Sequence, residues 1–168
     1  MAALAAADQP AGALDGVVLV NAPTELPSFA QDTAFGGVRR YLEKTLQPRQ
    51  WQDSSPLHHA DQLVHPLLVV VGTEDTMTPP DQGRRLAGAT PASALLEVTG
   101  MGHHPTPGEW AQILEAADRQ FDLGVRGHDV VDSGRGQRGR WSISAGGMRP
   151  MVVVVVHPHC QRLTPGRL

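Results

Sequence analysis

Apolar runs of strand length are the feature of this sequence that most restricts its fold. They stand at residues 15–23 ("DGVVLVNAP"), 65–72 ("HPLLVVVG") and 94–100 ("ALLEVTG"), and a segment with helical patterning follows each of them. Such runs are typical of strands buried on both faces, which occur in parallel sheets covered by helices. The sequence therefore predicts an α/β fold with about three mainly parallel strands and flanking helices.

The helical patterns can be placed along the chain. One covers about residues 38–46 inside a longer excursion, and a short helix follows the proline pair at 79–80. A third lies between residues 107 and 124, with Gly124 as the expected cap. Its apolar side chains recur at helical spacing: Trp110, Ile113, Leu114, Ala117 and Phe121. Residues 2–7 are expected to be the last turns of an Ala-rich helix.

The composition of the sequence changes near residue 124, which predicts a folded part at residues 1–123 and a tail at residues 124–168. The first half of the tail is rich in Gly and Arg without a sustained period, so we expect it to be disordered. Five valines at 152–156 follow. This β-prone run could pair with a sheet edge or promote aggregation.

Composition argues against several classes of function. The formal net charge of −3 gives no reason to expect nucleic acid or a membrane as a partner. Cys160 is the only cysteine, so neither a disulfide framework nor a thiolate metal cage is expected. We find no signal peptide or transmembrane segment and expect a cytoplasmic protein. No cofactor is expected.

Two clusters of residues in the tail could either bind a ligand or simply be exposed to solvent. His157, His159 and Cys160 are residue types that bind zinc, but a fourth ligand at regular spacing is absent. Arginines could bind phosphates, but no aromatic platform or groove-binding helix accompanies them; they stand at 126, 135, 138, 140 and 149. We favour a solvated tail that binds neither a metal nor nucleic acid.

An acid and a histidine follow neighbouring strands of the predicted sheet. Asp75 comes three residues after Gly72, and His103 comes shortly after the third strand. Taken alone, each could be an ordinary turn or loop residue. Because active groups gather beyond the carboxyl ends of parallel strands, we expect an Asp75 carboxylate oxygen to lie within hydrogen-bond or one-water reach of the His103 ring. Such a carboxylate can orient an imidazole that takes a proton from a hydroxyl nucleophile.

The motifs "GTEDTMTPPDQGRRLA" (72–87) and "VTGMGHHP" (98–105) closely resemble the carboxyl-terminal half of an α/β-hydrolase. The resemblance covers residues 2–123. Ser55-Pro56-Leu57 resembles the S-P-L of the esterase and prolyl-oligopeptidase-like branch, and "VLVNAPTEL" (18–26) resembles a carboxylesterase-like turn with Glu25 where Asp is usual. The resemblance implies a partial α/β-hydrolase fold.

The same resemblance assigns the catalytic acid to Asp75 and the catalytic base to His103. Glu74 is then a neighbour that points elsewhere, and His104 flanks the base. Asp81 is expected to be only a first-turn acid that favours its helix N-terminus.

The serine nucleophile of this family stands on a G-x-S-x-G elbow before the acid and the histidine. Residues 2–7 resemble the helix that follows this elbow, so the elbow is expected to be missing from this chain. Ser144, in "SAGG", imitates it, but no clear strand precedes it and Pro150 with the valines follows. Ser28, Ser54 and Ser55 have no elbow context.

The sequence thus predicts a relative of serine hydrolases that act on ester or peptide bonds. It keeps the acid and the histidine, lacks the nucleophile, and is expected to be inactive by itself. The alternative is a non-catalytic fragment or interaction module. A small-molecule ester or a peptide is the expected substrate of the full-length relative, and self-association through an uncovered sheet edge is a further expectation.

Overall fold

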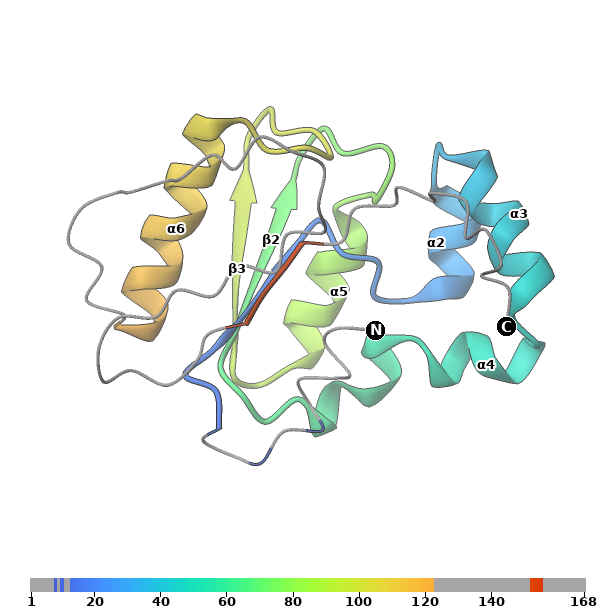
Figure 1. Cartoon of the computed structure of the whole chain (residues 1–168), viewed down its shortest axis with the longest axis horizontal. Coiled ribbons are helices and arrows are strands. Elements are labelled where there is room, and N and C mark those ends of the chain that lie inside the picture. The colour runs from blue at the N-terminus through green and yellow to red at the C-terminus, as the bar shows by residue number, and fades with distance from the viewer. Residues whose placement is uncertain (1–7, 9, 11–12, 123–151, 156–168) are drawn as a thin grey trace, which may run out of the picture.

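A computed structural model describes residues 8, 10, 13–122 and 152–155 of the 168-residue chain, and its centre is a parallel sheet (Figure 1). The strands are β1 (Val17–Val20), β2 (Leu67–Gly72), β3 (Ser93–Val98) and β4 (Val152–Val155), in the order β3-β2-β1-β4. All three pairings are parallel. The three strands expected from the apolar runs are therefore confirmed.

Helices α5 (Asp81–Ala89) and α6 (Pro107–Phe121) cover the sheet. The excursion between β1 and β2 holds α2 (Leu26–Asp32), α3 (Gly36–Thr45), α4 (Pro48–Asp53) and a 3₁₀ helix, η1 (Pro56–Gln62). Figure 1 shows α2, α3 and α4 grouped to one side of the sheet. The helices expected near residues 38–46, after the proline pair and from residue 107 are present.

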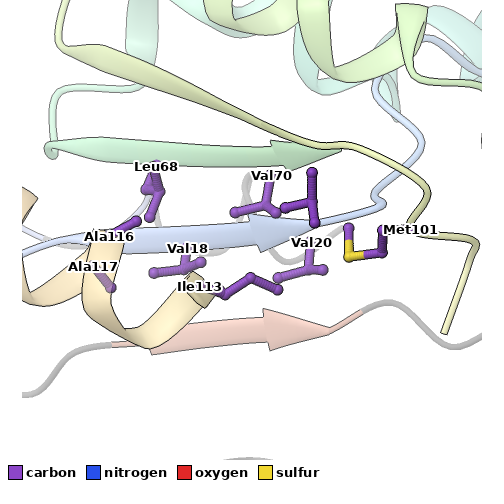
Figure 2. Close-up of a cluster of buried hydrophobic side chains, with 9 residues drawn as sticks. Val18, Val20, Leu68, Val70, Met101, Ile113, Ala116 and Ala117 are labelled. Atoms are coloured by element: carbon purple, nitrogen blue, oxygen red, sulfur yellow. The ribbon is translucent and has the colours of Figure 1, made fainter. Parts of the chain in front are cut away.

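Strand residues alternate between two apolar cores, one on each face of the sheet. On one face, side chains of β1 and β2 meet α6 (Figure 2); this core comprises Val18, Val20, Leu68, Val70, Val98, Met101, Ile113, Ala116 and Ala117. The opposite face packs against α5 and η1, with Leu14, Val17, Leu19, Ala60, Leu63, Leu67, Val69, Val71 and Leu86. Both faces of β1 and β2 are buried, which is why their sequences show no polar alternation.

The valine run pairs with a sheet edge, which is one of the two outcomes that its sequence allowed. Val152–Val155 aligns in parallel with Val17–Val20. This fourth strand lies in the tail, beyond its Gly- and Arg-rich half. Four β-branched residues suit the free edge that β1 offers. The rest of the tail, the helix expected at residues 2–7 and the cap expected at Gly124 lie outside the described residues. The division of the chain at residue 124 stays a prediction.

Helix α6 is capped at both ends, and its C-terminal cap lies two residues before the expected Gly124. Thr106 and Glu109 form a capping box at its start, which satisfies backbone N–H groups of the first turn. The helix ends at Phe121, and Asp122 adopts the left-handed conformation with φ 50°. Asp is among the few residue types that enter this region readily, so a glycine is not required at the cap.

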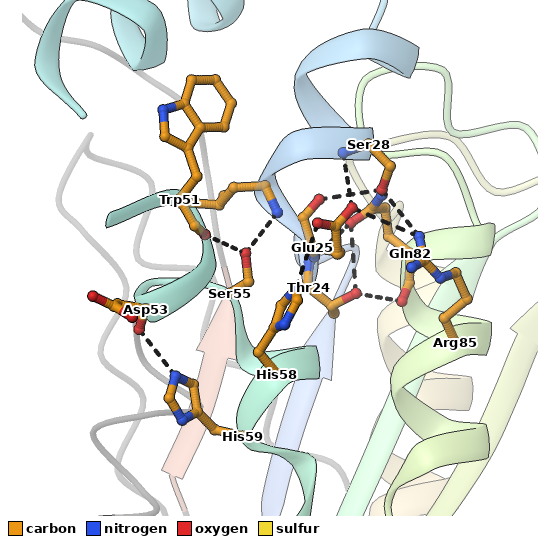
Figure 3. A network of polar contacts seen from close by, with 11 residues as sticks. Thr24, Glu25, Ser28, Trp51, Asp53, Ser55, His58, His59, Gln82 and Arg85 are labelled. Carbon is orange, nitrogen blue, oxygen red and sulfur yellow. Dashed lines mark hydrogen bonds and ion pairs between the residues drawn. The ribbon is translucent and has the colours of Figure 1, made fainter. Parts of the chain in front are cut away.

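A buried glutamine joins the turn after β1 to helix α5 (Figure 3). The Gln82 Oε1 atom accepts the backbone N–H groups of Thr24 (3.1 Å) and Glu25 (2.9 Å), and its Nε2 donates to the Ser28 hydroxyl (2.9 Å). Ser55 extends the contact to the excursion, since its hydroxyl accepts the Leu26 N–H at 2.9 Å. These bonds fix the path of the chain as it leaves the sheet.

Glu25 caps helix α2 within this cluster. Burial raises the pKa of its carboxyl, but hydrogen bonds from Ser28 and His58 and the charge of Arg85 outweigh burial and hold the pKa below its ordinary value. The Glu25 carboxylate accepts the Ser28 N–H at 2.8 Å and lies 3.8 Å from the Arg85 guanidinium. The ionised form is therefore the one that the fold stabilises.

We expect opposite effects from adding one methyl group at two glycines of α5. A Cβ at Gly83 would lie 2.3 Å from Val71 Cγ1, whereas a Cβ at Gly88 meets nothing within 4 Å. Gly83→Ala should lower the free energy of unfolding by about 1–3 kcal/mol through overpacking. Gly88→Ala, the matched control, should raise it by about 0.5–1 kcal/mol. Urea unfolding measures both, and equal gains would contradict the close packing of α5 on β2.

The lowered pKa of Glu25 predicts a pH-dependent contribution to stability. Because the folded pKa lies below the unfolded one, the contribution is present above about pH 4.3 and is lost as the pH falls through the folded pKa. Glu25→Gln should therefore lower the free energy of unfolding by about 1 kcal/mol at pH 7. This difference should shrink below about pH 4.3. A difference that stays constant between pH 7 and pH 3 would argue against the proposed charge effect.

Candidate active site

Asp75 is buried in the turn that follows β2, and both oxygens of its carboxylate face hydrogen-bond donors. Its Oδ1 accepts the backbone N–H groups of Met77 and Thr78, each at 2.8 Å, and its Oδ2 lies 2.8 Å from the Nδ1 atom of His103. Three donors satisfy this carboxylate, and the Asp75 side chain is 0% exposed. A carboxylate held in this way can orient an imidazole without turning away from it.

His103 meets Asp75 from the loop after β3, and the predicted contact is present. When Nδ1 carries the proton and donates to the carboxylate, Nε2 is left as the acceptor. This Nε2 is buried, and it has no hydrogen-bond partner among the residues that the structure describes. The ring of His104 packs against that of His103 at 5.0 Å and 76°. The His103 ring therefore has one nitrogen, Nε2, that is able to accept a further hydrogen bond.

The acid turn and the histidine loop are joined directly through their backbones. Thr73 donates its N–H to the carbonyl of Val98 (3.2 Å), and its hydroxyl accepts the N–H of Gly100 (2.9 Å). The Glu74 N–H donates to the Met101 carbonyl at 3.0 Å, while the Glu74 side chain is exposed, as expected for a neighbour of the acid. These bonds limit how far the two loops can separate.

The excursion after β1 also contacts the acid turn. At the joint between α2 and α3, the Thr33 hydroxyl donates to the Met77 carbonyl (2.7 Å) and the Ala34 N–H donates to the Thr76 carbonyl (2.9 Å). The turn that holds Asp75 is therefore supported from the helical side as well. Asp81 lies in the first turn of α5, in the structural position expected for it.

Asn21 is a site residue that sequence reasoning missed. It directly follows β1, is 2% exposed, and bonds to both the acid turn and the histidine loop. A polar residue immediately after a run of buried aliphatic residues was the available signal. Asn21 follows β1 as Asp75 and His103 follow β2 and β3, so its place at the shared edge of the sheet could be predicted in the same way.

Several serines of the described segments have their hydroxyls bonded away from His103. Ser28 interacts with Gln82, Ser55 donates to the Trp51 carbonyl (2.6 Å), and Ser93 donates to the Ala87 carbonyl (2.6 Å). Ser54 caps the end of α4. Ser144, the elbow mimic, lies outside the described residues. No nucleophile can thus be assigned from the observed contacts.

The described part of the chain contains neither a metal-binding group nor a membrane span. No three His, Cys, Asp or Glu residues in it are placed to hold an ion. No helix there combines the length and the apolar character needed to cross a bilayer. The cluster of His157, His159 and Cys160 falls outside the described residues, so its interpretation stays a prediction.

Comparison with known proteins finds a matching family and similar solved structures. The family described as TAP-like protein, an α/β-hydrolase family, matches residues 35–119. A puromycin-hydrolyzing peptidase from Mycobacterium tuberculosis is similar in structure, with a TM-score of 0.56 and 27% identity over 63% of this chain and 18% of that one. A puromycin hydrolase superposes with a TM-score of 0.60 and 24% identity over 72% and 20% of the two chains. The chain thus spans about a fifth of these relatives. No curated protein matches it.

Removing the Asp75 carboxylate should lower the free energy of unfolding more than exchanging it for an amide does. Asp75→Ala leaves the N–H groups of Met77 and Thr78 without their acceptor, and each unsatisfied buried donor costs about 1–3 kcal/mol. Asp75→Asn can keep Oδ1 as an acceptor and should retain most of this stability. Urea unfolding of both variants measures the difference. Equal losses would show that the Oδ1 bonds do not support the turn.

Proposed function

The chain belongs to the TAP-like family of the α/β-hydrolase superfamily, and we propose on this basis that it supplies the acid and base of a serine hydrolase that cleaves peptide or ester bonds. Asp75 is the acid and His103 is the base in this proposal. The observation that carries it is the buried Nδ1 to Oδ2 contact of 2.8 Å together with an unpartnered Nε2. Burial strengthens this pairing because solvent does not screen it.

The proposed chemistry uses the two ring nitrogens for different tasks. Asp75 holds the proton on Nδ1, so Nε2 accepts the hydroxyl proton of a serine as its oxygen attacks the substrate carbonyl carbon. The carbonyl π electrons move onto oxygen and form a tetrahedral intermediate. When the bond to the leaving group breaks, Nε2 returns the proton to the departing amine or alkoxide. Water then removes the acyl group by the same proton transfers, and serine is regenerated.

The serine and the oxyanion donors are the parts that we propose to come from outside residues 13–122. Serine hydroxyls with observed bonds in that range are engaged at other places, and the elbow motif expected before the acid was not recognised in the sequence. Each oxyanion donor is typically worth about 10²–10³ in rate, so the pair alone should support little catalysis. A non-catalytic role is the second candidate, and it is favoured by the described serine hydroxyls, which bond to groups other than His103.

The proposed substrate is a small peptide-like amide or ester. Support comes from the puromycin-hydrolyzing peptidase, which this chain resembles at 27% identity. The acid turn is braced by the α2 to α3 joint, so the excursion is the part of this chain best placed to border a substrate near the pair.

A chimera tests the acid and base directly. Residues 13–122 would replace the matching segment of the M. tuberculosis peptidase, and puromycin hydrolysis would be measured. We expect hydrolysis by the chimera, and a loss of kcat on the order of 10⁴-fold with either Asp75→Ala or His103→Ala. His59→Ala is the control, because His59 lies in η1 and bonds the Asp53 carbonyl. A folded chimera without activity, or with activity indifferent to His103, would favour the non-catalytic candidate.

The unaltered full chain provides the companion measurement. Offered a fluorophosphonate probe, it should show no covalent label at serine, since the proposal places the nucleophile outside residues 13–122 and assigns it neither to Ser144 nor to another tail serine. Labelling of Ser144 that disappears in His103→Ala would contradict that placement and identify an internal nucleophile.

A further inference from the structure

Asn21 occupies an unusual backbone position at the carboxyl end of β1. Its φ is 47°, in the left-handed region that few residues other than glycine enter. Its N–H continues the sheet ladder by donating to the Val70 carbonyl at 3.0 Å. The left-handed step then turns the chain away from the sheet. Asparagine tolerates this conformation better than most residues, but the turn alone would suit glycine at least as well.

The side chain of Asn21 explains why asparagine stands there. Its Nδ2 donates to the carbonyl oxygens of Gly102 and His103, each at 3.0 Å, and its Oδ1 accepts the Gly72 N–H at 2.9 Å. Reversing the amide would set its oxygen against two carbonyl oxygens, so hydrogen bonding requires this orientation. Both donors and one acceptor position of a buried amide are thereby used.

The two carbonyls belong to the peptide units on either side of the His103 Cα atom. Holding both units restricts φ and ψ of His103, and these angles set the direction of its Cβ bond. That direction decides whether the ring reaches the carboxylate of Asp75. Asn21 itself touches neither ring nitrogen.

The third side-chain hydrogen bond of Asn21 is made with Gly72, where the turn that holds Asp75 begins. Gly72 donates its N–H to Asn21 Oδ1, and its carbonyl accepts the N–H of Asp75 at 3.2 Å, where the acid turn begins. The loops pass so closely here that a Cβ at Gly72 would lie 2.3 Å from the Met101 carbonyl oxygen. One side chain thus fixes the histidine loop relative to the start of the acid turn.

We propose that Asn21 is a positioning residue for His103: its side-chain amide fixes both peptide units that flank His103 against the start of the Asp75 turn, and so sets the ring in reach of the carboxylate. The proposal rests on the proposed function for its catalytic meaning. Its geometric content concerns the His103 to Asp75 contact and can be tested without any activity. Asn21 acts through His103 and has no role in proton transfer.

Two substitutions separate the effect of the Asn21 side-chain amide from the effect of its left-handed backbone conformation. Asn21→Gly keeps the left-handed conformation and removes all three side-chain bonds. Asn21→Asp keeps the shape and the acceptor for Gly72, but sets an oxygen against the carbonyls of Gly102 and His103. Ser93→Ala is the matched control, because the Ser93 hydroxyl likewise bonds two backbone carbonyls, those of Ala87 and Thr90, beside the amino end of β3.

Proton NMR of the full chain reads out the contact. The wild type should show a low-field Nδ1 proton resonance of His103, assigned by its absence in His103→Ala. We expect this resonance to be lost in Asn21→Gly and Asn21→Asp while the backbone amide spectrum remains that of a folded chain. Ser93→Ala should keep it, although urea unfolding shows a comparable loss of stability.

Each outcome of these measurements either supports or overturns the proposed role of Asn21. A resonance that persists in Asn21→Gly would overturn the proposal, as would general unfolding of that variant, because Asn21 would then act on the fold as a whole. Loss of the resonance in Ser93→Ala as well would show that it follows global stability rather than Asn21. The proposed function fails separately, when activity of the chimera is indifferent to His103.

Discussion

The parallel register of β1, β2 and β3 is the constraint on which the rest of the structure depends. Gly72 at the end of β2 aligns with Val98 at the end of β3, so the two strands finish side by side. A loop of a few residues then suffices to bring Asp75 and His103 together. In an antiparallel pair the same two segments would leave the sheet at opposite ends. Burial on both faces specifies this register, because a one-residue slip would exchange the two cores.

Close approach of the two loops adds a second constraint. The backbone at Gly72 leaves no room for a side chain beside the Met101 carbonyl, and Thr73 and Glu74 bond directly to the histidine loop. The buried pair is therefore held by a framework of backbone hydrogen bonds around it. Such a framework is what an acid and base need, since small displacements of reacting groups reduce rates strongly.

The helical excursion shows where sequence reasoning reached its limit. Helix α3 carried enough periodicity to be predicted, whereas α2, α4 and η1 were missed. They span only six or seven residues each. Elements this short gain their stability from tertiary contacts rather than from intrinsic propensity. The Ser55 hydroxyl and the Gln82 side chain supply such contacts, and the residues they bond to, Leu26 and Glu25, lie 29 and 57 positions away in the sequence.

The sequence by itself determined the α/β class, the three main strands, the helices after them and the pair of Asp75 and His103. These follow from local patterns, because continuous apolar runs encode buried strands and the ends of parallel strands share one edge. Only the tertiary structure decided that Val152–Val155 pairs with β1 and that Asn21 joins both loops. Both depend on contacts between residues some 50 to 135 positions apart. Local patterns mark the valine run and the strand-end position of Asn21, but the groups that they bond to come together only after the sheet has formed.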